Sequence, residues 1–348
     1  MTYRNKMILL SVLALLLLGT YSLGPLLTSS DSRRLIAHPW LENVDAGSIS
    51  KIEFLNQEFA VIRSNEKRGD NQQPIWSVSL ENEMFPADIK KVEAFTDRIA
   101  NLAYYSEAAA LPDSWSKFSV DDQSGLKLRI FTNVDAEIQE NFLETAEQAQ
   151  ENSPTETIVF GESLEGSDRQ YARKISSDAT YVVEDLHRYL EKESGYWSDL
   201  ALFSEMLSIQ DVIALEFITK ENEQFRFRRS EEGLDQVEWS LTSEGVDAKD
   251  VDLETMNRHI RNLIELSAEK FATRDERTYS GITEAHTIIS FETIRGNLYK
   301  LRIGNKNNRQ QVYVRPMHRQ YTYLVSQWRL NTVLNPLKEL VQLQDKPE

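Results

Sequence analysis

The 348-residue chain contains no cysteine. It can therefore form no disulfide, thiolate metal site or cysteine nucleophile, and it cannot carry the lipid of a lipoprotein. Its five histidines are scattered, without a pair at i, i+4 or an H-E-x-x-H motif, so nothing indicates a zinc site. The nucleotide-binding loops G-x-x-x-x-G-K-[ST] and G-x-G-x-x-G are also missing, which argues against an ATPase.

Other catalytic chemistry has little support. The segment 161–166 misses the nucleophile-elbow spacing by one residue, and we interpret it as a turn. Three Ser-x-x-Lys hits, including Ser114 to Lys117, lack the companion motifs of serine hydrolases. Acidic pairs such as Asp121-Asp122 are more typical of surface turns than of a catalytic cleft. A serine or carboxylate hydrolase is a remote alternative, and we predict no catalytic residue, metal or cofactor.

Charge is missing from one long apolar segment, residues 7–30. As a helix its 24 residues would span about 36 Å, enough to cross a hydrocarbon core of about 30 Å. Arg4 and Lys6 precede it and Asp31 follows, so the positive-inside rule keeps the N-terminus in the cytoplasm and exports the remainder. A cleaved signal peptide is the alternative, but Pro25 sits badly beside the best small-residue cleavage positions. The sequence predicts a single transmembrane anchor.

The exported region is long enough for two domains, and its 41% hydrophobic and 27% charged residues are typical of chains that fold. We predict a cytoplasmic tip and anchor at 1–30, a linker at 31–46, domains at 47–207 and 208–343, and a tail at 344–348.

The exported region also matches itself, which predicts a tandem duplication. At an offset of about 163 residues, two tripeptides recur: Ile52-Glu53-Phe54 as Leu215-Glu216-Phe217, and Trp76-Ser77-Val78 as Trp239-Ser240-Leu241. At offsets of 142 to 143, Gly161 matches Gly304, and Tyr171-Ala172-Arg173 matches Tyr313-Val314-Arg315.

Each copy opens with short β-type runs and continues into an amphipathic helix. The apolar stripe of the first helix is Val92, Phe95, Ile99 and Leu102. That of the second is Leu253, Met256, Ile260 and Leu263, with Asp252 as its expected N-cap. Alternating strands follow, with hairpin turns expected at 295–297 and 304–308. The predicted fold class is therefore α+β: a transmembrane helix followed by two tandem copies of an antiparallel sheet-plus-helix domain.

These strands, the anchor and the helix ending in Ala100-Asn101-Leu102 resemble a bacterial membrane-anchored family of unknown function. Its members carry this domain in tandem outside the cytoplasm and are often encoded beside gliding-motility-type ABC transporter components. The resemblance covers about residues 47 to 343 and rests on structural motifs, so it implies a compartment and a neighbourhood but no catalytic residues.

The two copies differ most in charge. Residues 130–168 contain ten acidic residues and no Lys, Arg or His, largely within an insertion at about 133–156. Conversely, Thr293 to Lys338 contains no acid. Residues 31–207 have 17 basic against 33 acidic residues, whereas residues 208–348 have 20 against 22. The first copy therefore holds nearly all of the negative charge.

Strand alternation places Lys300 and Arg302 on one face, where Tyr313 and Arg315 are expected to join them, with Arg319 close by. Three interpretations stay open for this face. It is a solvated surface or one that docks on the acidic insertion; it binds an anionic partner such as a lipid headgroup, a cell-wall polymer or an acidic protein; or it binds nucleic acid, which export disfavours.

The expectation that follows is a non-catalytic, membrane-anchored accessory or scaffold protein associated with an ABC-type transporter complex. It would sit in the bacterial inner membrane with most of the chain periplasmic or extracytoplasmic. Its partners would be membrane lipid through the N-terminal helix and a transporter subunit or other envelope protein, with no nucleotide or nucleic acid. The alternative is an anionic-ligand module acting through the basic face of the second repeat.

Overall fold

A computed structural model describes residues 37–342, with gaps at 43, 65–66, 69–70, 73–74, 133–152, 204–206, 222, 231–237, 244–245 and 286. The expected membrane anchor and most of the acidic insertion lie outside the described residues. Within the described part of the chain, no helix combines the length and apolar character needed to cross a membrane.

The first sheet is antiparallel and has ten strands in the order β1-β8-β12-β11-β10-β9-β2-β3-β6-β7. Its strands are β1 (His38–Pro39), β2 (Ile49–Phe54), β3 (Phe59–Ser64), β6 (Ile75–Leu80), β7 (Glu83–Pro86), β8 (Ala103–Ala109), β9 (Leu126–Thr132), β10 (Glu156–Ser163), β11 (Arg169–Lys174) and β12 (Thr180–Glu184). A separate small hairpin pairs β4 (Lys67–Arg68) with β5 (Asn71–Gln72).

The second sheet is also antiparallel and has nine strands in the order β16-β15-β14-β13-β18-β19-β20-β21-β17. Its strands are β13 (Val212–Ile218), β14 (Gln224–Ser230), β15 (Glu238–Ser243), β16 (Val246–Asp250), β17 (Lys270–Phe271), β18 (Thr287–Thr293), β19 (Leu298–Lys306), β20 (Gln311–Pro316) and β21 (Tyr323–Ser326). The prediction of antiparallel sheets accompanied by helices is confirmed.

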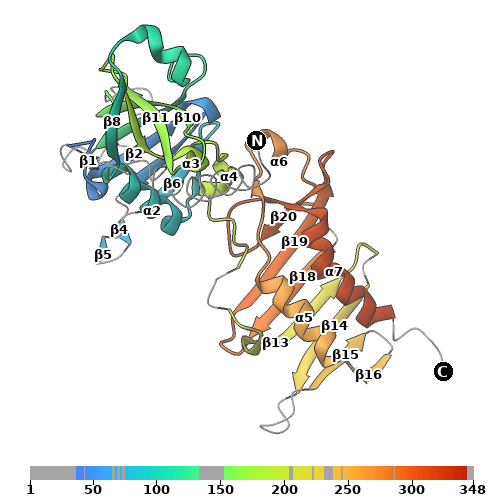
Figure 1. The fold of residues 1–348 in the computed structure, drawn as a ribbon. Coiled ribbons are helices and arrows are strands. Elements are labelled where there is room, and N and C mark those ends of the chain that lie inside the picture. The colour runs from blue at the N-terminus through green and yellow to red at the C-terminus, as the bar shows by residue number, and fades with distance from the viewer. Residues whose placement is uncertain are drawn as a thin grey trace, which may run out of the picture.

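The two sheets connect their strands in the same way. From β8 to β7 in the first sheet, each strand has a counterpart between β17 and β16 in the second, in the same spatial order. The pair β2 and β9 lies in the middle of one sheet, and β13 and β18 take the same position in the other. We call each sheet with its helices a unit, and Figure 1 shows the first unit in blue to green and the second in yellow to red.

One helix in each unit packs its apolar stripe on the sheet. These are α2 (Ile89–Ala100), which buries Val92, Phe95 and Ile99, and α5 (Leu253–Ile264), which buries Met256, Ile260 and Leu263. An aspartate precedes each helix and accepts a hydrogen bond from a backbone amide of the first turn: Asp88 from Lys91 at 3.3 Å and Asp252 from Thr255 at 2.8 Å. Such caps satisfy amides that have no partner inside the helix, and the predicted cap at Asp252 is confirmed.

The end of each unit differs. The first unit ends in the short helices α3 (His187–Leu190) and α4 (Ser194–Trp197), whereas the second ends in the longer α7 (Gln327–Gln342). The two helices α5 and α7 pack together, and the His259 ring Nδ1 lies 2.8 Å from the Val333 carbonyl oxygen. His259 is completely buried there.

Two glycines predicted to lie in turns lie inside strands instead. Gly161 is in β10 and Gly304 is in β19, whose turn begins only after Lys306. A Cβ atom at Gly161 would lie 2.0 Å from the Phe118 carbonyl oxygen, and one at Gly304 would lie 2.2 Å from the Ser280 carbonyl oxygen. In both units a segment crosses the sheet so closely that only glycine fits beneath it. The turn at 295–297 is as predicted, with Gly296 at a φ of +76°.

Candidate functional site

Three basic residues of β19 and β20 lie on the sheet face opposite α5 and α7. Arg302 of β19 lies directly opposite Arg315 of β20, and the Met317 amide donates to the Lys300 carbonyl oxygen at 2.8 Å. The alternating residues Leu301 and Ile303 point the other way into the core. The structure therefore brings Lys300, Arg302 and Arg315 together, and we call these three side chains the basic face.

Tyr313 does not share the exposed part of this face, which corrects the expected geometry. It is only 4% exposed and packs in a small cluster with Ala272, Ile282 and Leu324. The residues that follow β17, including α6 (Arg274–Arg277), cover this end of the sheet. Strand alternation gave Tyr313 the correct side of the sheet, but no local pattern indicated that a segment some 30 residues earlier would cover it.

Arg319 also departs from the expected arrangement. Its Nη1 donates to Asp199 Oδ2 at 2.9 Å, in the chain that links the two units. This pairing ties the guanidinium to the linking segment. Arg319 therefore contributes to the joint between the units.

No acidic side chain among the described residues forms an ion pair with the basic face. Among the described residues, Lys300, Arg302 and Arg315 form no ion pair, although two like charges lie directly opposite each other. The Nε atoms of both arginines are shielded from solvent and have no hydrogen-bond partner in the described part of the chain. A buried donor without a partner costs free energy, which an anion placed between the two guanidinium groups would recover.

In the first unit, the arginine at the position that corresponds to Arg315 has partners within the protein. Arg173 of β11 takes the place there that Arg315 takes in β20, and its Nε donates to the Val120 carbonyl oxygen at 2.7 Å. Its guanidinium carbon lies 3.8 Å from the centre of the Trp115 ring, and its Nη2 reaches Asp122 at 3.3 Å. Val159, opposite Arg173, replaces the second arginine. The open arginine pair is therefore particular to the second unit.

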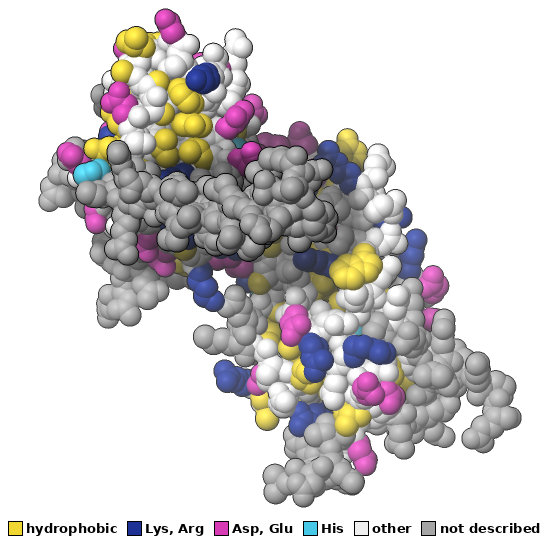
Figure 2. All heavy atoms as spheres, in the orientation of Figure 1, with side chains coloured by type: hydrophobic (Ala, Val, Ile, Leu, Met, Phe, Trp, Pro, Cys, Tyr) yellow, Lys and Arg dark blue, Asp and Glu magenta, His cyan; other side chains and the backbone are white. Residues whose placement is uncertain are grey.

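The neighbouring strands add polar groups to this side of the sheet. Glu216 of β13 accepts hydrogen bonds from Gln224 and from Arg226, the latter at 3.0 Å. Ser290 lies opposite both Glu216 and Lys300, is 3% exposed, and its hydroxyl has no partner among the described residues. Glu216 is thus already paired with Arg226, while a second acid on this side of the sheet, Glu292 of β18, lies directly opposite Leu298. Elsewhere, the visible side of the second unit carries interspersed basic and acidic side chains, as a solvated surface does (Figure 2).

A second feature is the joint between the units. The Asp199 amide donates to the Pro86 carbonyl oxygen at 2.9 Å, and the Ala268 amide donates to the Leu200 carbonyl oxygen at 2.8 Å. The linking segment is thus hydrogen-bonded to β7 on one side and to the chain before β17 on the other. Gly195 lies so close to the second unit that a Cβ atom there would be 2.6 Å from the Glu269 carbonyl oxygen.

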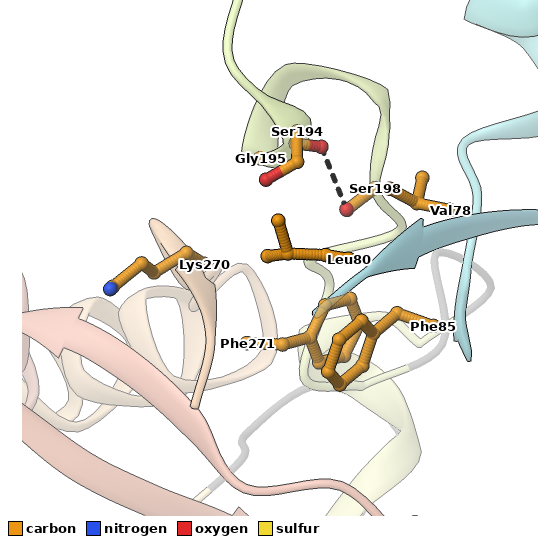
Figure 3. A pocket seen from close by; sticks show the side chains of 8 residues that line it. All are labelled: Val78, Leu80, Phe85, Ser194, Gly195, Ser198, Lys270 and Phe271. Atoms are coloured by element: carbon orange, nitrogen blue, oxygen red, sulfur yellow. Dashed lines mark hydrogen bonds between the residues drawn. The ribbon is translucent and has the colours of Figure 1, made fainter. Parts of the chain in front are cut away.

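Side chains close the same joint. Phe85 of the first sheet stacks on Phe271 of the second with ring centres 4.6 Å apart, and Leu80 lies beside them (Figure 3). Arg277 donates to both carboxylate oxygens of Glu83, at 3.1 and 2.6 Å. These hydrogen bonds hold the pKa of Glu83 below its usual value of 4.5. The cavity left between the units measures about 10 Å³, room for no more than one water molecule.

A larger hollow of about 320 Å³ opens where the chain enters the first unit. Trp40, Tyr104 and Tyr181 line it, and the Tyr104 and Tyr181 rings meet edge to face at 5.3 Å. Two of its charged groups pair with each other, since Lys174 Nζ lies 3.7 Å from Glu156 Oε1. A third, Glu42, also lines the hollow, which therefore has aromatic walls and a net negative charge.

Of the residues considered for hydrolase chemistry, Ser114 and Lys117 lie in a short 3₁₀ helix, Pro112–Phe118, and Asp121 lies in the turn that follows it. The Ser114 hydroxyl donates to the Leu111 carbonyl oxygen at 2.7 Å, while Lys117 Nζ lies 5.6 Å from the Phe118 ring centre. Asp121 accepts from the amides of Gln123 and Ser124, which lowers its pKa. Within the described ranges, no three His, Asp or Glu side chains form a group that could hold a metal ion.

Comparison with known families matches residues 76–285 to a family described as a domain of unknown function (DUF4340). This match runs from the strand β6 through the joint and α5 to the residues just before β18. No curated protein and no solved structure matches the chain. Because the matched region covers well over half of the 348 residues, the chain belongs to the DUF4340 family of domains of unknown function.

Proposed function

We propose that this protein is a non-catalytic accessory or scaffold protein, anchored in the bacterial inner membrane by residues 7–30, whose two units stand outside the cytoplasm as a tandem repeat. The joint between the units is the observation that carries the proposal. Hydrogen bonds along the linker, the Phe85–Phe271 stack and the Glu83–Arg277 pair hold the two sheets in one relative position. A rigid pair of units suits a protein that presents two surfaces to one assembly.

The proposed partner is a membrane-embedded subunit of an ABC-type transporter. The support is the apolar N-terminal segment and the resemblance to anchored proteins encoded beside such transporters. In this reading, ATP hydrolysis belongs to another subunit.

The first test is the membrane topology of the chain. Because the sequence has no native cysteine, an introduced cysteine is the only thiol that can be labelled. A single cysteine at the exposed position Leu111 should react with a membrane-impermeant maleimide added to spheroplasts. A cysteine at Thr2 should react only after the membrane is permeabilised. Labelling of the Leu111→Cys variant only after permeabilisation would overturn the proposed export.

Partner binding provides the second test. The tagged full-length chain, solubilised in mild detergent after crosslinking, should recover a transporter permease subunit. A variant lacking residues 1–30 and exported by a cleavable signal should recover much less of it, because it loses the membrane contact. Recovery of the full-length chain alone would contradict the accessory role.

A second candidate function, binding of an anionic partner, is supported by the unneutralised pair Arg302 and Arg315. Guanidinium groups bind phosphate and carboxylate oxygens through paired hydrogen bonds, and these two lack any partner of that kind among the described residues. The full-length protein should pellet with vesicles or wall material that carry negative charge. Charge reversal at both arginines should abolish the charge-dependent part of that binding, and unchanged pelleting would exclude this function.

A further inference from the structure

The side of the sheet that carries the basic face ends in apolar residues. Leu298, which begins β19, is 66% exposed, and Ile294 in the preceding turn is 64% exposed. Met317, whose amide bonds to the Lys300 carbonyl, is 49% exposed. Single apolar residues scattered over a surface need no explanation, but these three occur at one end of one sheet. We call them the apolar rim.

The register gives the order of residues along this side of the sheet. Leu298 follows the turn at 295–297, with Glu292 of β18 directly opposite it. Lys300 and Met317 lie side by side one step further along the strands, and the opposed pair Arg302 and Arg315 comes next. An anionic ligand dissolved in water would satisfy the arginines but leave the rim in contact with water. An apolar protein groove would cover the rim but not neutralise the arginines.

A phospholipid bilayer with anionic headgroups offers both environments in the same order. Its boundary region accepts apolar side chains, and the phosphate layer immediately outside it binds lysine and arginine. We propose that this end of the second unit rests on an anionic bilayer, with the apolar rim at the acyl boundary and the basic face on headgroup phosphates. This inference rests on the proposed anionic-partner function and names its partner.

The first unit carries opposite charge at the matching hairpin. The turn between β18 and β19 has only four residues, 294–297, whereas the connection between β9 and β10 contains Asp135, Glu137, Glu140 and further acids. An anionic surface would repel that hairpin. Of these two connections, the one between β18 and β19 therefore has the charge that suits contact with such a membrane.

Fluorescence in reconstituted vesicles tests the inference with the full-length chain. A single cysteine at Leu298 is labelled with an environment-sensitive fluorophore, and nitroxides on the lipid acyl chains act as quenchers. In vesicles containing phosphatidylglycerol we expect a blue-shifted emission and about twofold stronger quenching than in pure phosphatidylcholine, because basic residues near an anionic surface are attracted to it. The same label at Leu111, exposed on the first unit, should respond equally to both lipids.

Charge-reversal variants distinguish binding through the basic face from a general effect of the protein's net charge. In the Leu298→Cys background, Arg302→Glu with Arg315→Glu should remove the lipid-dependent difference. Lys220→Glu with Arg309→Glu changes the net charge equally at exposed turns of the opposite sheet end and should preserve the difference. The wild-type comparison between lipids needs no charge substitution, so it remains informative if the double variant folds poorly.

Equal quenching at Leu298 in both lipids would overturn the bilayer inference. If arginine-dependent pelleting with an anionic wall polymer nevertheless persisted, the anionic-partner function would stand and only its assignment to lipid would fail. The inference would also be overturned if the Lys220→Glu, Arg309→Glu control lost the difference in quenching between the two lipids. The lipid dependence would then reflect the net charge of the protein.

Discussion

Phe85 of the first sheet stacks face to face on Phe271 of the second, with ring centres 4.6 Å apart. Phe85 is 3% exposed and belongs to the hydrophobic core of the second unit, although its strand is part of the first sheet. A residue of the first sheet therefore completes the core of the second unit, and unfolding of either unit exposes it.

Replacing Phe85 with alanine should uncouple the units. Removal of a buried phenylalanine costs about 3 to 5 kcal/mol, and here that cost falls on the joint. Calorimetry should show the unfolding transitions of the two units moving apart. Phe118→Ala, which removes a ring packed at a tilt against Tyr171 in the first unit, should lower stability without separating the transitions. An unchanged profile for Phe85→Ala would show that the joint transmits no stability.

Acid should weaken the joint through Glu83. Hydrogen bonds from Arg277 hold the pKa of Glu83 below 4.5 in the folded protein. A lowered carboxylate pKa stabilises the fold above the unfolded-state value and loses that contribution as the pH falls through the folded-state value. The stability difference between wild type and Glu83→Gln should thus be constant near neutral pH and shrink below about pH 4.5. Glu184→Gln, which breaks the Arg98 pair inside the first unit, should not affect coupling between the transitions.

His259 should make the second unit sensitive to milder acid. Complete burial lowers the pKa of His259 from 6.5 to about 4, so the folded state keeps the ring neutral while the unfolded state takes up a proton. Stability should fall between pH 6.5 and about pH 4, by about 3 kcal/mol in total, and level off below that range. His259→Asn can still donate to the Val333 carbonyl and should flatten this slope in denaturant titrations. His38→Asn, at an exposed position, should leave the slope unchanged.

Gly304→Ala should destabilise the second unit. The added methyl group would lie 2.2 Å from the Ser280 carbonyl oxygen, and backbone cannot yield as easily as a side chain. We expect a loss of about 1 to 3 kcal/mol in chemical denaturation, as for other overpacked sites. Gly47→Ala meets only the movable Asp45 carboxylate, at 3.0 Å, and should cost much less. Similar effects for both variants would contradict the close crossing.

The two matching arginines should respond differently to substitution by methionine. Arg173→Met removes a hydrogen bond to the Val120 carbonyl and the stack on Trp115, so we expect a loss of about 2 kcal/mol. Arg315→Met removes one of two opposed charges and an unpartnered donor, so stability should be unchanged or higher. Equal losses in thermal unfolding would indicate that Arg315 serves the fold rather than a ligand.

Local sequence patterns predicted the elements that local chemistry controls. Alternation put Leu301 in the core and Lys300 on the opposite face, because successive strand residues point to opposite sides of a sheet. Asp252 marked the start of α5, because its carboxylate satisfies an amide only three residues away. The helix α7 was missed, since Pro336 lies within it and proline normally interrupts helices.

By itself, the sequence determined an uncharged N-terminal segment, strands and helices in a recurring order, and a contrast in charge between the two halves. The tertiary structure alone decided which of the basic residues remain open. Tyr313 was covered by the segment after β17, Arg319 was paired with Asp199 from the linker, and Arg315 was left without the partners that enclose Arg173. Side-chain direction depends on the backbone within one strand, whereas burial and ion pairing depend on distant segments that only the folded chain brings together.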